Sequence, residues 1–213
     1  MRRLLSNAKR KYLYFRRSKY FKDIESLISN RPSIISNNCF AGRIYQDFNL
    51  PYNSPTAGLY MFYPDYINFL LNLEDNLKGK LEFVRKSKYE LGNKRIDESK
   101  HFYPIAILNG TIEIHFLHYK SEKEAESKWY RRANRVDFNN IVIFGAELDL
   151  CRSDDISIFD KLDFENKFFF TAKEYDYNSC LQIREFKSKG VVGDPYRYGH
   201  LFYRAISKKL RDE

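Results

Sequence analysis

The sequence has little of what marks several common protein classes. Its 213 residues include three cysteines, nine glycines, six prolines and one tryptophan. Three scattered cysteines without a C-x-x-C spacing are too few for a disulfide framework and argue against a structural zinc site. No run of 18 apolar residues occurs, so we expect no helix that spans a bilayer. The polar, basic start lacks the apolar core of a signal peptide, which together with the odd cysteine count predicts a cytoplasmic protein.

The chain also lacks the short motifs that name a chemistry. It has no G-x-x-x-x-G-K, no G-x-G-x-x-G, no H-E-x-x-H and no G-x-S-x-G. What it has is a large stock of core-forming side chains, with 18 Phe and 17 Tyr and 43% hydrophobic residues. Such a composition excludes disorder and predicts one globular domain of ordinary size.

The positive charge is confined to the first 22 residues. The net charge is +9, and residues 1–22 hold nine Lys or Arg and no acidic residue, while the rest of the chain carries 28 of each sign. Apolar residues recur every three to four positions over 3–29, which predicts an amphipathic helix. We therefore divide the chain into a basic helical arm, residues 1–30, and one α/β domain, residues 31–213.

Aromatic and basic residues interleave in this arm between positions 10 and 22. That pattern suits a helix lying on an anionic membrane surface, which would make the protein peripheral at the inner membrane face. A helix docked on the domain, with its basic side in water, is the simpler alternative. Nucleic acid is an unlikely partner, because the neutral domain adds no basic surface to the arm.

Apolar strands alternate with helices along the rest of the chain. We expect a three-layer α/β sandwich with a mixed, largely parallel sheet. Asn109-Gly110 predicts a hairpin turn, and Ser121 with Glu124 forms a capping box. The predicted strands are 32–36, 81–84, 103–108, 111–119, 140–145, 167–172 and 181–186. The predicted helices are 39–48, 64–77, 121–137, 154–162 and 199–210, with loops at 50–58 and 89–102.

The turn after the first strand is the first candidate site. Ser36, Asn37, Asn38 and Cys39 come at the carboxyl end of a strand and the start of a helix, where backbone N–H groups suit an anion or oxyanion. A helix N-terminus would lower the pKa of Cys39 and make it a candidate nucleophile. Alternatively, the Asn pair satisfies the turn and Cys39 packs as a small apolar residue.

His118 is the candidate general base or acid. It lies near the end of the predicted second hairpin strand. His115, three positions earlier, would face the other side of the strand, so a joint metal site is not expected. A hydrogen-bonded structural role for His118 is an equal alternative.

The helix after the hairpin offers an anion clamp and a stacking surface. Arg131 and Arg135 are one turn apart, as are Trp129 and Arg132. Guanidinium groups at this spacing hold phosphate or carboxylate, and an indole stacks on a flat ring. A solvated face with salt bridges to nearby Glu residues is the alternative.

Glu147 and Asp149 follow the apolar strand 140–145. Their spacing resembles the Asp-x-Asp of metal-dependent glycosyltransferases, with Glu in first place. Two such carboxylates could hold a divalent ion on a nucleotide sugar. No cofactor is required by any motif, and this metal pair is an alternative site.

Six segments of the chain form an ordered set. They are Ile35-Ser36-Asn37-Asn38-Cys39-Phe40-Ala41-Gly42, Leu50-Pro51-Tyr52-Asn53-Ser54-Pro55-Thr56, Tyr103-Pro104, His115-Phe116-Leu117-His118-Tyr119, Glu124-Ala125 and Trp129-Tyr130-Arg131-Arg132. This set resembles an uncharacterised bacterial family, whose members are often described as exopolysaccharide or capsular polysaccharide biosynthesis proteins. The resemblance covers roughly residues 31–185. Phe40 stands where Trp is frequent, and Ala41 where a second small residue, commonly Gly, is expected.

The resemblance implies a three-layer α/β domain and a pathway rather than a reaction. It favours a transferase of an acyl, phosphoryl or glycosyl group that acts on a sugar or lipid-linked glycan intermediate. In that scheme the 36–39 turn binds a phosphate or oxyanion, His118 is the base, and Arg132 and Arg135 hold the donor. The alternative is a non-enzymatic glycan- or lipid-binding accessory protein of polysaccharide assembly.

Overall fold

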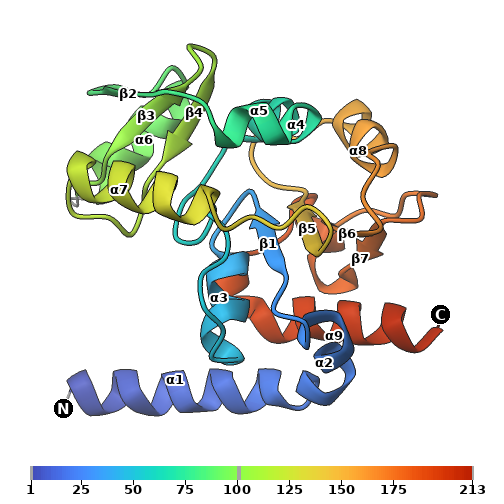
Figure 1. Cartoon of the computed structure of the whole chain (residues 1–213). Helices are drawn as coiled ribbons and strands as arrows, with labels where there is room; N and C mark the ends of the chain where they lie inside the picture. The colour runs from blue at the N-terminus through green and yellow to red at the C-terminus, as the bar shows by residue number, and fades with distance from the viewer. Residues whose placement is uncertain (1, 100–101, 213) are drawn as a thin grey trace.

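A four-stranded parallel sheet forms the centre of the computed structural model, which describes residues 2–99 and 102–212 (Figure 1). The strand order is β1-β5-β6-β7, and every neighbouring pair is parallel. The predicted largely parallel sheet is thus confirmed. The strands are β1 (Ser33–Ser36), β5 (Ile141–Ala146), β6 (Asn166–Thr171) and β7 (Cys180–Gln182).

Alternation along these strands divides the core into two parts. Ile34 and Phe144 belong to one buried cluster, whereas their neighbours Ile35 and Ile143 belong to the other. Successive side chains of a strand point to opposite faces, so each face of the sheet has its own apolar layer. Because both faces are buried, the middle of each strand is a short apolar run, and the central strand β5 is apolar throughout.

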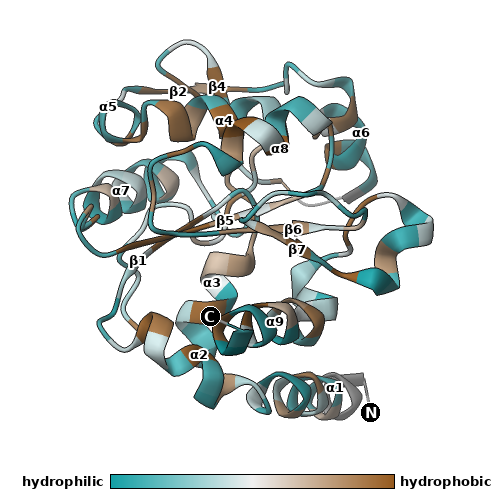
Figure 2. Ribbon diagram, turned by 90° about the vertical axis from the view of Figure 1, so that its right-hand side faces the viewer, coloured by the Kyte–Doolittle hydropathy of each residue, from teal (hydrophilic) through white to brown (hydrophobic). Residues whose placement is uncertain are grey.

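Helices cover both faces of this sheet (Figures 1 and 2). The cluster around Ile34 includes residues of α2, α3 and α9, and the cluster around Ile35 includes residues of α4, α7 and α8. The first group is α2 (Phe21–Ile28), α3 (Phe40–Asp47) and α9 (Pro195–Asp212). The second group is α4 (Tyr63–Leu71), followed by α5 (Leu73–Leu77), α7 (Glu122–Ala133) and α8 (Ser153–Asp160).

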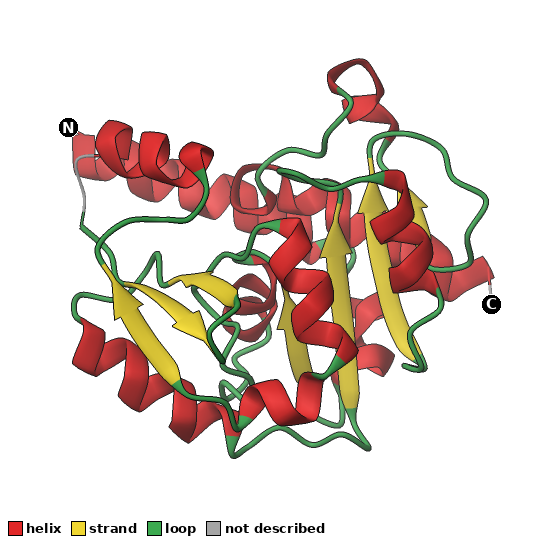
Figure 3. Ribbon diagram, turned by 90° about the horizontal axis from the view of Figure 1, so that it is seen from above, coloured by secondary structure: helices red, strands yellow, loops and turns green. Residues whose placement is uncertain are grey.

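The predicted hairpin forms a second, antiparallel sheet (Figure 3). Asn109 and Gly110 both have positive φ, at 51° and 72°, as the tight turn requires. The expectation that these strands would join the parallel sheet was wrong, because β1 pairs with β5 and the hairpin pairs with β2 instead. The strands are β2 (Leu81–Val84), β3 (Ile105–Leu108) and β4 (Ile112–His115).

Residues 89–102, predicted as a loop, contain helix α6 (Glu90–Ser99), and residues 100–101 lie outside the described part of the chain. The segment is too polar to show a clear apolar stripe. Side-chain bonds hold its start: the Asn93 Nδ2 donates to the carbonyls of Ser87 and Tyr89 at 2.8 and 3.2 Å. A helix that begins with polar side-chain bonds of this kind leaves no periodic apolar pattern in the sequence.

Two helices that were predicted as continuous are broken. Residues 3–29 form α1 (Arg2–Ser18) and α2 with a turn between them, and α4 and α5 are separated at Asn72. The predicted strand 181–186 is shorter in the structure, where β7 ends at Gln182 and the 3-10 helix η1 (Arg184–Lys189) follows it. None of the helices in the described residues is long and apolar enough to cross a membrane.

A buried ion pair fastens α1 to the domain. Arg17 is 3% exposed, and its Nε and Nη2 donate to the two carboxylate oxygens of Asp47 at 2.5 and 2.8 Å. The Tyr203 hydroxyl donates to the same carboxylate at 3.1 Å. Asp47 on α3 therefore links α1 and α9, which lie side by side beneath the sheet in Figures 1 and 2.

A second buried polar network lies in the antiparallel sheet. Glu113 is fully buried and accepts hydrogen bonds from the Ser87 hydroxyl at 2.5 Å, the Lys88 amide at 2.6 Å and His115 Nε2 at 2.6 Å. Burial by itself raises the pKa of this carboxyl, but the bonds from His115, Ser87 and Lys88 outweigh it, so the net pKa is lowered. Glu113 is therefore ionised at neutral pH.

We expect Glu113→Gln to lower the free energy of unfolding by about 3 kcal/mol at pH 7, because the amide cannot accept the same three donors. A carboxyl whose pKa is lower in the folded than in the unfolded state stabilises the fold at pH values above the unfolded-state pKa. That stabilisation is lost as the pH falls through the folded-state pKa. The difference between wild type and variant, measured by urea unfolding, should therefore shrink below about pH 4. Glu82→Gln on the exposed side of β2 is the matched control, and equal stability of E113Q and E82Q would contradict the prediction.

Candidate active site

The candidate site lies at the carboxyl end of β1, where α/β sheets bind ligands. The side chains of Ser36, Asn37 and Asn38 are buried there and hold the turn. The Ser36 hydroxyl donates to the Asn38 carbonyl at 2.6 Å and accepts from the Ala41 amide at 3.1 Å. Asn38 accepts from the Phe40 amide at 2.9 Å. Since these residues satisfy the first amides of α3, the turn is built as a rigid support rather than an open anion nest.

Cys39, the N-cap residue of α3, meets His118 at a cavity of about 370 Å³. The Cys39 Sγ lies 3.3 Å from the His118 Nε2. His118 is exposed and comes three residues after the end of β4, whereas His115 is buried in the Glu113 network. The structure thus brings together two residues that are 79 positions apart. The cavity is lined by Cys39, Gly42, Gln46, Tyr52, Ala57, Gly58, His118, Tyr119, Lys128, Arg132 and Tyr196.

The Cys39 thiol is protonated in the resting site. Its pKa is raised from 9.0 to about 12: burial is the main cause, Asp194 adds to the rise, and Arg43 opposes both. The expectation that the helix N-terminus would lower this pKa was wrong. The physical reason is that desolvation outweighs the helix dipole, and the Phe40 and Ala41 amides are already bonded to side chains of the turn. Any reaction of Cys39 needs a base, and His118 is in place to be that base.

Arg132 supplies a fixed positive charge to the same cavity. Its Nη1 donates to the Tyr119 hydroxyl at 2.7 Å and to the Ala57 carbonyl at 3.2 Å. The guanidinium also lies over the Tyr52 ring, 4.6 Å from its centroid. The Tyr119 hydroxyl in turn donates to the Ala57 carbonyl. Arg132 is therefore held on three sides at the cavity wall.

The other residues of the predicted clamp lie elsewhere. Trp129 is fully buried against Phe69 and Phe116, so in this structure it belongs to the core and is not available to stack a ligand. Arg131 is exposed on α7, and Arg135 is exposed and donates to the Tyr52 carbonyl at 3.5 Å. Of the predicted arginines, Arg132 is the one that lines the cavity.

A second cavity of about 360 Å³ lies on the other side of Cys39. It contains an ion pair in which the Arg95 Nη2 donates to Asp149 at 2.6 Å, and the Tyr60 hydroxyl donates to the same carboxylate oxygen at 2.5 Å. Asn38 also lines this cavity. The charge of Asp149 is therefore already balanced by Arg95.

Glu147 is engaged as well. Its carboxylate accepts from the amides of Ala172 and Lys173 at 2.7 and 3.3 Å and from the Tyr175 hydroxyl at 2.8 Å. These bonds join the segments that follow β5 and β6. Across residues 2–99 and 102–212, no group of three or more His, Cys, Asp or Glu is placed to hold a metal ion. Both carboxylates of the alternative metal pair thus serve local structure.

Several cavity residues were not singled out as site residues from the sequence. Tyr52 and Tyr119 lie within segments that carry the family resemblance, which was the one available signal for them. Lys128, Gln46 and Tyr196 carry no signal of their own, because an isolated Lys, Gln or Tyr is common on any surface. They reach the cavity from α7, α3 and α9.

The raised pKa of Cys39 predicts slow alkylation. A shift from 9.0 to about 12 lowers the thiolate fraction at pH 8 by roughly a thousandfold, so iodoacetamide should react with folded protein far more slowly than with a free thiol. The rate should still be rising with pH at pH 10. We would measure it by mass spectrometry on a Cys151→Ser/Cys180→Ser variant, with the same variant in urea as the control. Rapid alkylation at pH 7 would contradict a buried, protonated thiol.

Comparison with known proteins places the chain in a family. An uncharacterized protein of Haemophilus influenzae is 35% identical over 167 residues, covering 78% of this chain and 74% of that protein. The family described as Domain of unknown function (DUF1919) matches residues 10–211. This match is wider than the range 31–185 expected from the segments above, and it includes part of α1. The cavity between Cys39, His118 and Arg132 therefore belongs to a domain of the DUF1919 family, of which this chain is a member.

Proposed function

We propose that the protein is a transferase of exopolysaccharide or capsular polysaccharide biosynthesis that acts on a sugar or lipid-linked glycan intermediate. One observation carries the enzyme proposal: a cysteine and a histidine in hydrogen-bond contact at a cavity at the carboxyl end of a parallel strand. We propose that the domain is a three-layer α/β sandwich and that its substrates enter at the edge of the parallel sheet where β1 ends. The pathway rests on the segment resemblance described above.

Acyl transfer suits this pair best, because a thiol forms a thioester. In the first step Cys39 Sγ bonds to the donor carbonyl carbon while His118 Nε2 takes the thiol proton, and His118 then gives that proton to the leaving group. In the second step an acceptor hydroxyl of the glycan gives its proton to His118 and attacks the thioester carbon, which releases Cys39 as thiolate. The thiolate recovers its proton from His118. Arg132 lies where it would attract an anionic donor.

A binding protein without chemistry is the second candidate, and the pKa of Cys39 favours it. A thiol with a pKa of about 12 is a poor nucleophile unless a base assists, and neither Tyr60 nor Tyr119 compensates, since burial raises the pKa of both. In this version the cavity holds a glycan or lipid headgroup through Arg132, Lys128 and the tyrosines. A measurement of catalytic turnover distinguishes the transferase from the binding protein.

We expect incubation with acetyl-coenzyme A and a polysaccharide acceptor to release coenzyme A, and to add one acetyl group to Cys39 when the acceptor is left out. His118→Ala should slow release about a hundredfold or more, the usual contribution of a general base. Cys39→Ser should abolish the protein-bound acetyl group, detected by intact-protein mass spectrometry. Cys151→Ser is the matched control and should behave as wild type.

If Cys39→Ser keeps full turnover while His118→Ala loses it, the transfer is direct and Cys39 is not a nucleophile. Glycan binding without release of coenzyme A, unaffected by His118→Ala, would support the accessory protein and contradict the transferase.

We also propose that α1 rests on an anionic membrane, which would place the protein at the inner membrane face. Tyr12 and Phe15 are 58% and 62% exposed on α1. Arg16 lies over the Tyr12 ring at 5.7 Å, and Lys19 lies over the Phe15 ring at 5.1 Å. Exposed rings flanked by cations match the interfacial zone of a bilayer with acidic lipids.

Tyr12→Ser/Phe15→Ser should weaken binding to vesicles that contain about one third anionic lipid by roughly tenfold, because two rings leave the interface. Co-sedimentation measures the change, and Phe138→Ser, an exposed ring elsewhere on the surface, is the control. Binding that is equal for the double variant and the control, or that persists on neutral vesicles, would contradict the proposal.

A further inference from the structure

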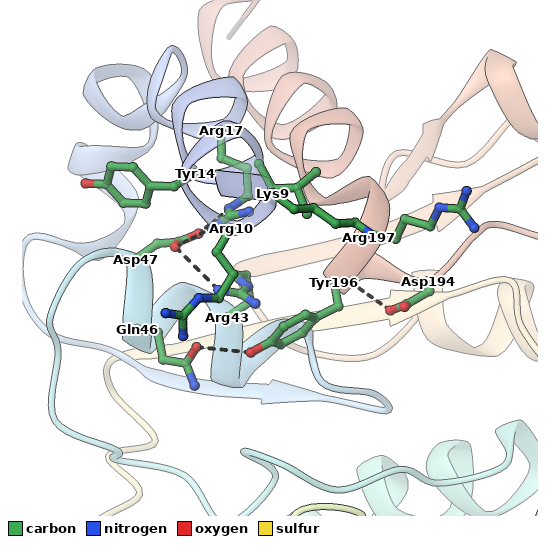
Figure 4. Close-up of a pocket in the computed structure, with 11 residues that line it drawn as sticks. Lys9, Arg10, Tyr14, Arg17, Arg43, Gln46, Asp47, Asp194, Tyr196 and Arg197 are labelled. Atoms are coloured by element: carbon green, nitrogen blue, oxygen red, sulfur yellow. Dashed lines mark hydrogen bonds and ion pairs between the residues drawn. The ribbon is translucent and has the colours of Figure 1, made fainter. Parts of the chain in front are cut away.

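A further pocket, distinct from the Cys39 cavity, lies between α1, α3 and the start of α9 (Figure 4). It has a volume of about 630 Å³, within the range of small-molecule sites. Figure 4 shows side chains from all three helices around it. It is lined by Lys9, Arg10, Leu13, Tyr14, Arg17, Arg43, Gln46, Asp47, Asp194, Tyr196 and Arg197.

The lining of this pocket is strongly positive. It includes five Lys or Arg side chains and two carboxylates. The Asp47 side chain is 3% exposed and is shared by Arg17, Arg43 at 3.8 Å and the Tyr203 hydroxyl. Arg10 and Arg197 are exposed, so their charges are presented to solvent at the rim. The buried Arg17–Asp47 ion pair forms the floor of the pocket. The net positive charge of the residues around it favours binding of an anion.

The pocket adjoins the cavity that contains the Cys39–His118 pair. Gln46 and Tyr196 line both, and the Tyr196 hydroxyl donates to the Gln46 side-chain oxygen at 3.5 Å. The Arg43 guanidinium stacks on the Tyr196 ring, 3.6 Å from its centroid. One ligand could therefore lie across Tyr196, with an anionic part on one side and a reacting part on the other.

We propose that this pocket binds the phosphate or diphosphate group of the substrate and so places the adjoining group beside Cys39 and His118. The proposal deepens the proposed transferase function and rests on it for the identity of the reacting group, but the phosphate site stands on the pocket itself. Guanidinium forks match phosphate oxygens in pairs, which a single ammonium does not. The phosphate would come from a nucleotide-linked donor, coenzyme A or a lipid-linked diphosphate, all of which share this chemistry.

The test is binding of inorganic pyrophosphate to the full chain by isothermal titration calorimetry. We expect Arg10→Gln/Arg197→Gln to raise the Kd at least tenfold and to flatten its dependence on salt, because both guanidinium groups are exposed and their loss leaves the Arg17–Asp47 pair intact. Arg184→Gln, at an exposed arginine outside the pocket, is the control. His118→Ala should bind pyrophosphate as wild type does.

Two competition experiments identify the molecule that carries the phosphate. Competition of pyrophosphate by a uridine diphosphate sugar or coenzyme A in solution indicates a soluble donor, whereas competition only by vesicles that carry a lipid diphosphate indicates a lipid-linked one. Equal pyrophosphate affinity for the double variant and Arg184→Gln, or no binding by wild type, would overturn the phosphate site and leave the coenzyme A release assay to decide the transferase separately. Pyrophosphate binding that depends on Arg10 and Arg197, with no turnover on any donor, would keep the site and reject the transferase.

Discussion

The bonded turn at the end of β1 is the constraint on which the candidate site depends. Ser36 and Asn38 use their side chains to satisfy the first amides of α3, and Asn37 accepts the Met61 amide through its carbonyl at 3.0 Å. The turn therefore ties the parallel sheet to α3 and to the segment before α4. Because this frame is buried and held by these bonds, Cys39 has a fixed position, and burial is the main cause of the raised pKa of its thiol.

The inserted antiparallel sheet supplies the other half of the site. β1 and β5 are neighbours in the sheet, yet the chain between them builds α4 to α7 and the three antiparallel strands. This excursion returns His118 and Arg132 to the edge where β1 ends, and the His118 amide donates to the Gly58 carbonyl at 3.2 Å. Gly58 has φ of +85° and lies against His118, so a side chain there would meet both a strained backbone and the imidazole.

Charge is distributed along one side of the molecule by the same packing. α1 and α9 come from opposite ends of the chain and meet over α3, with Asp47 between Arg17 and Tyr203. This packing brings Lys9, Arg10 and Arg17 of α1 to the pocket with Arg43 and Arg197. The pocket lies on the side of α1 that carries Arg10, Tyr14 and Arg17, whereas Tyr12 and Phe15 expose their rings elsewhere on the same helix.

The sequence by itself determined the local elements whose causes are local. Asn109-Gly110 made the hairpin because both residues tolerate positive φ, and the apolar run at 140–145 became a central strand. At the start of α7 the Ser121 hydroxyl accepts from the Glu124 amide, and the Glu124 carboxylate accepts from the amide of Lys120, one residue before the predicted partner. Only the tertiary structure decided that Trp129 fills the core and that Cys39 meets His118 with a raised rather than a lowered pKa. Those outcomes depend on desolvation and on contacts between distant segments, and neither is written in the spacing of neighbouring residues.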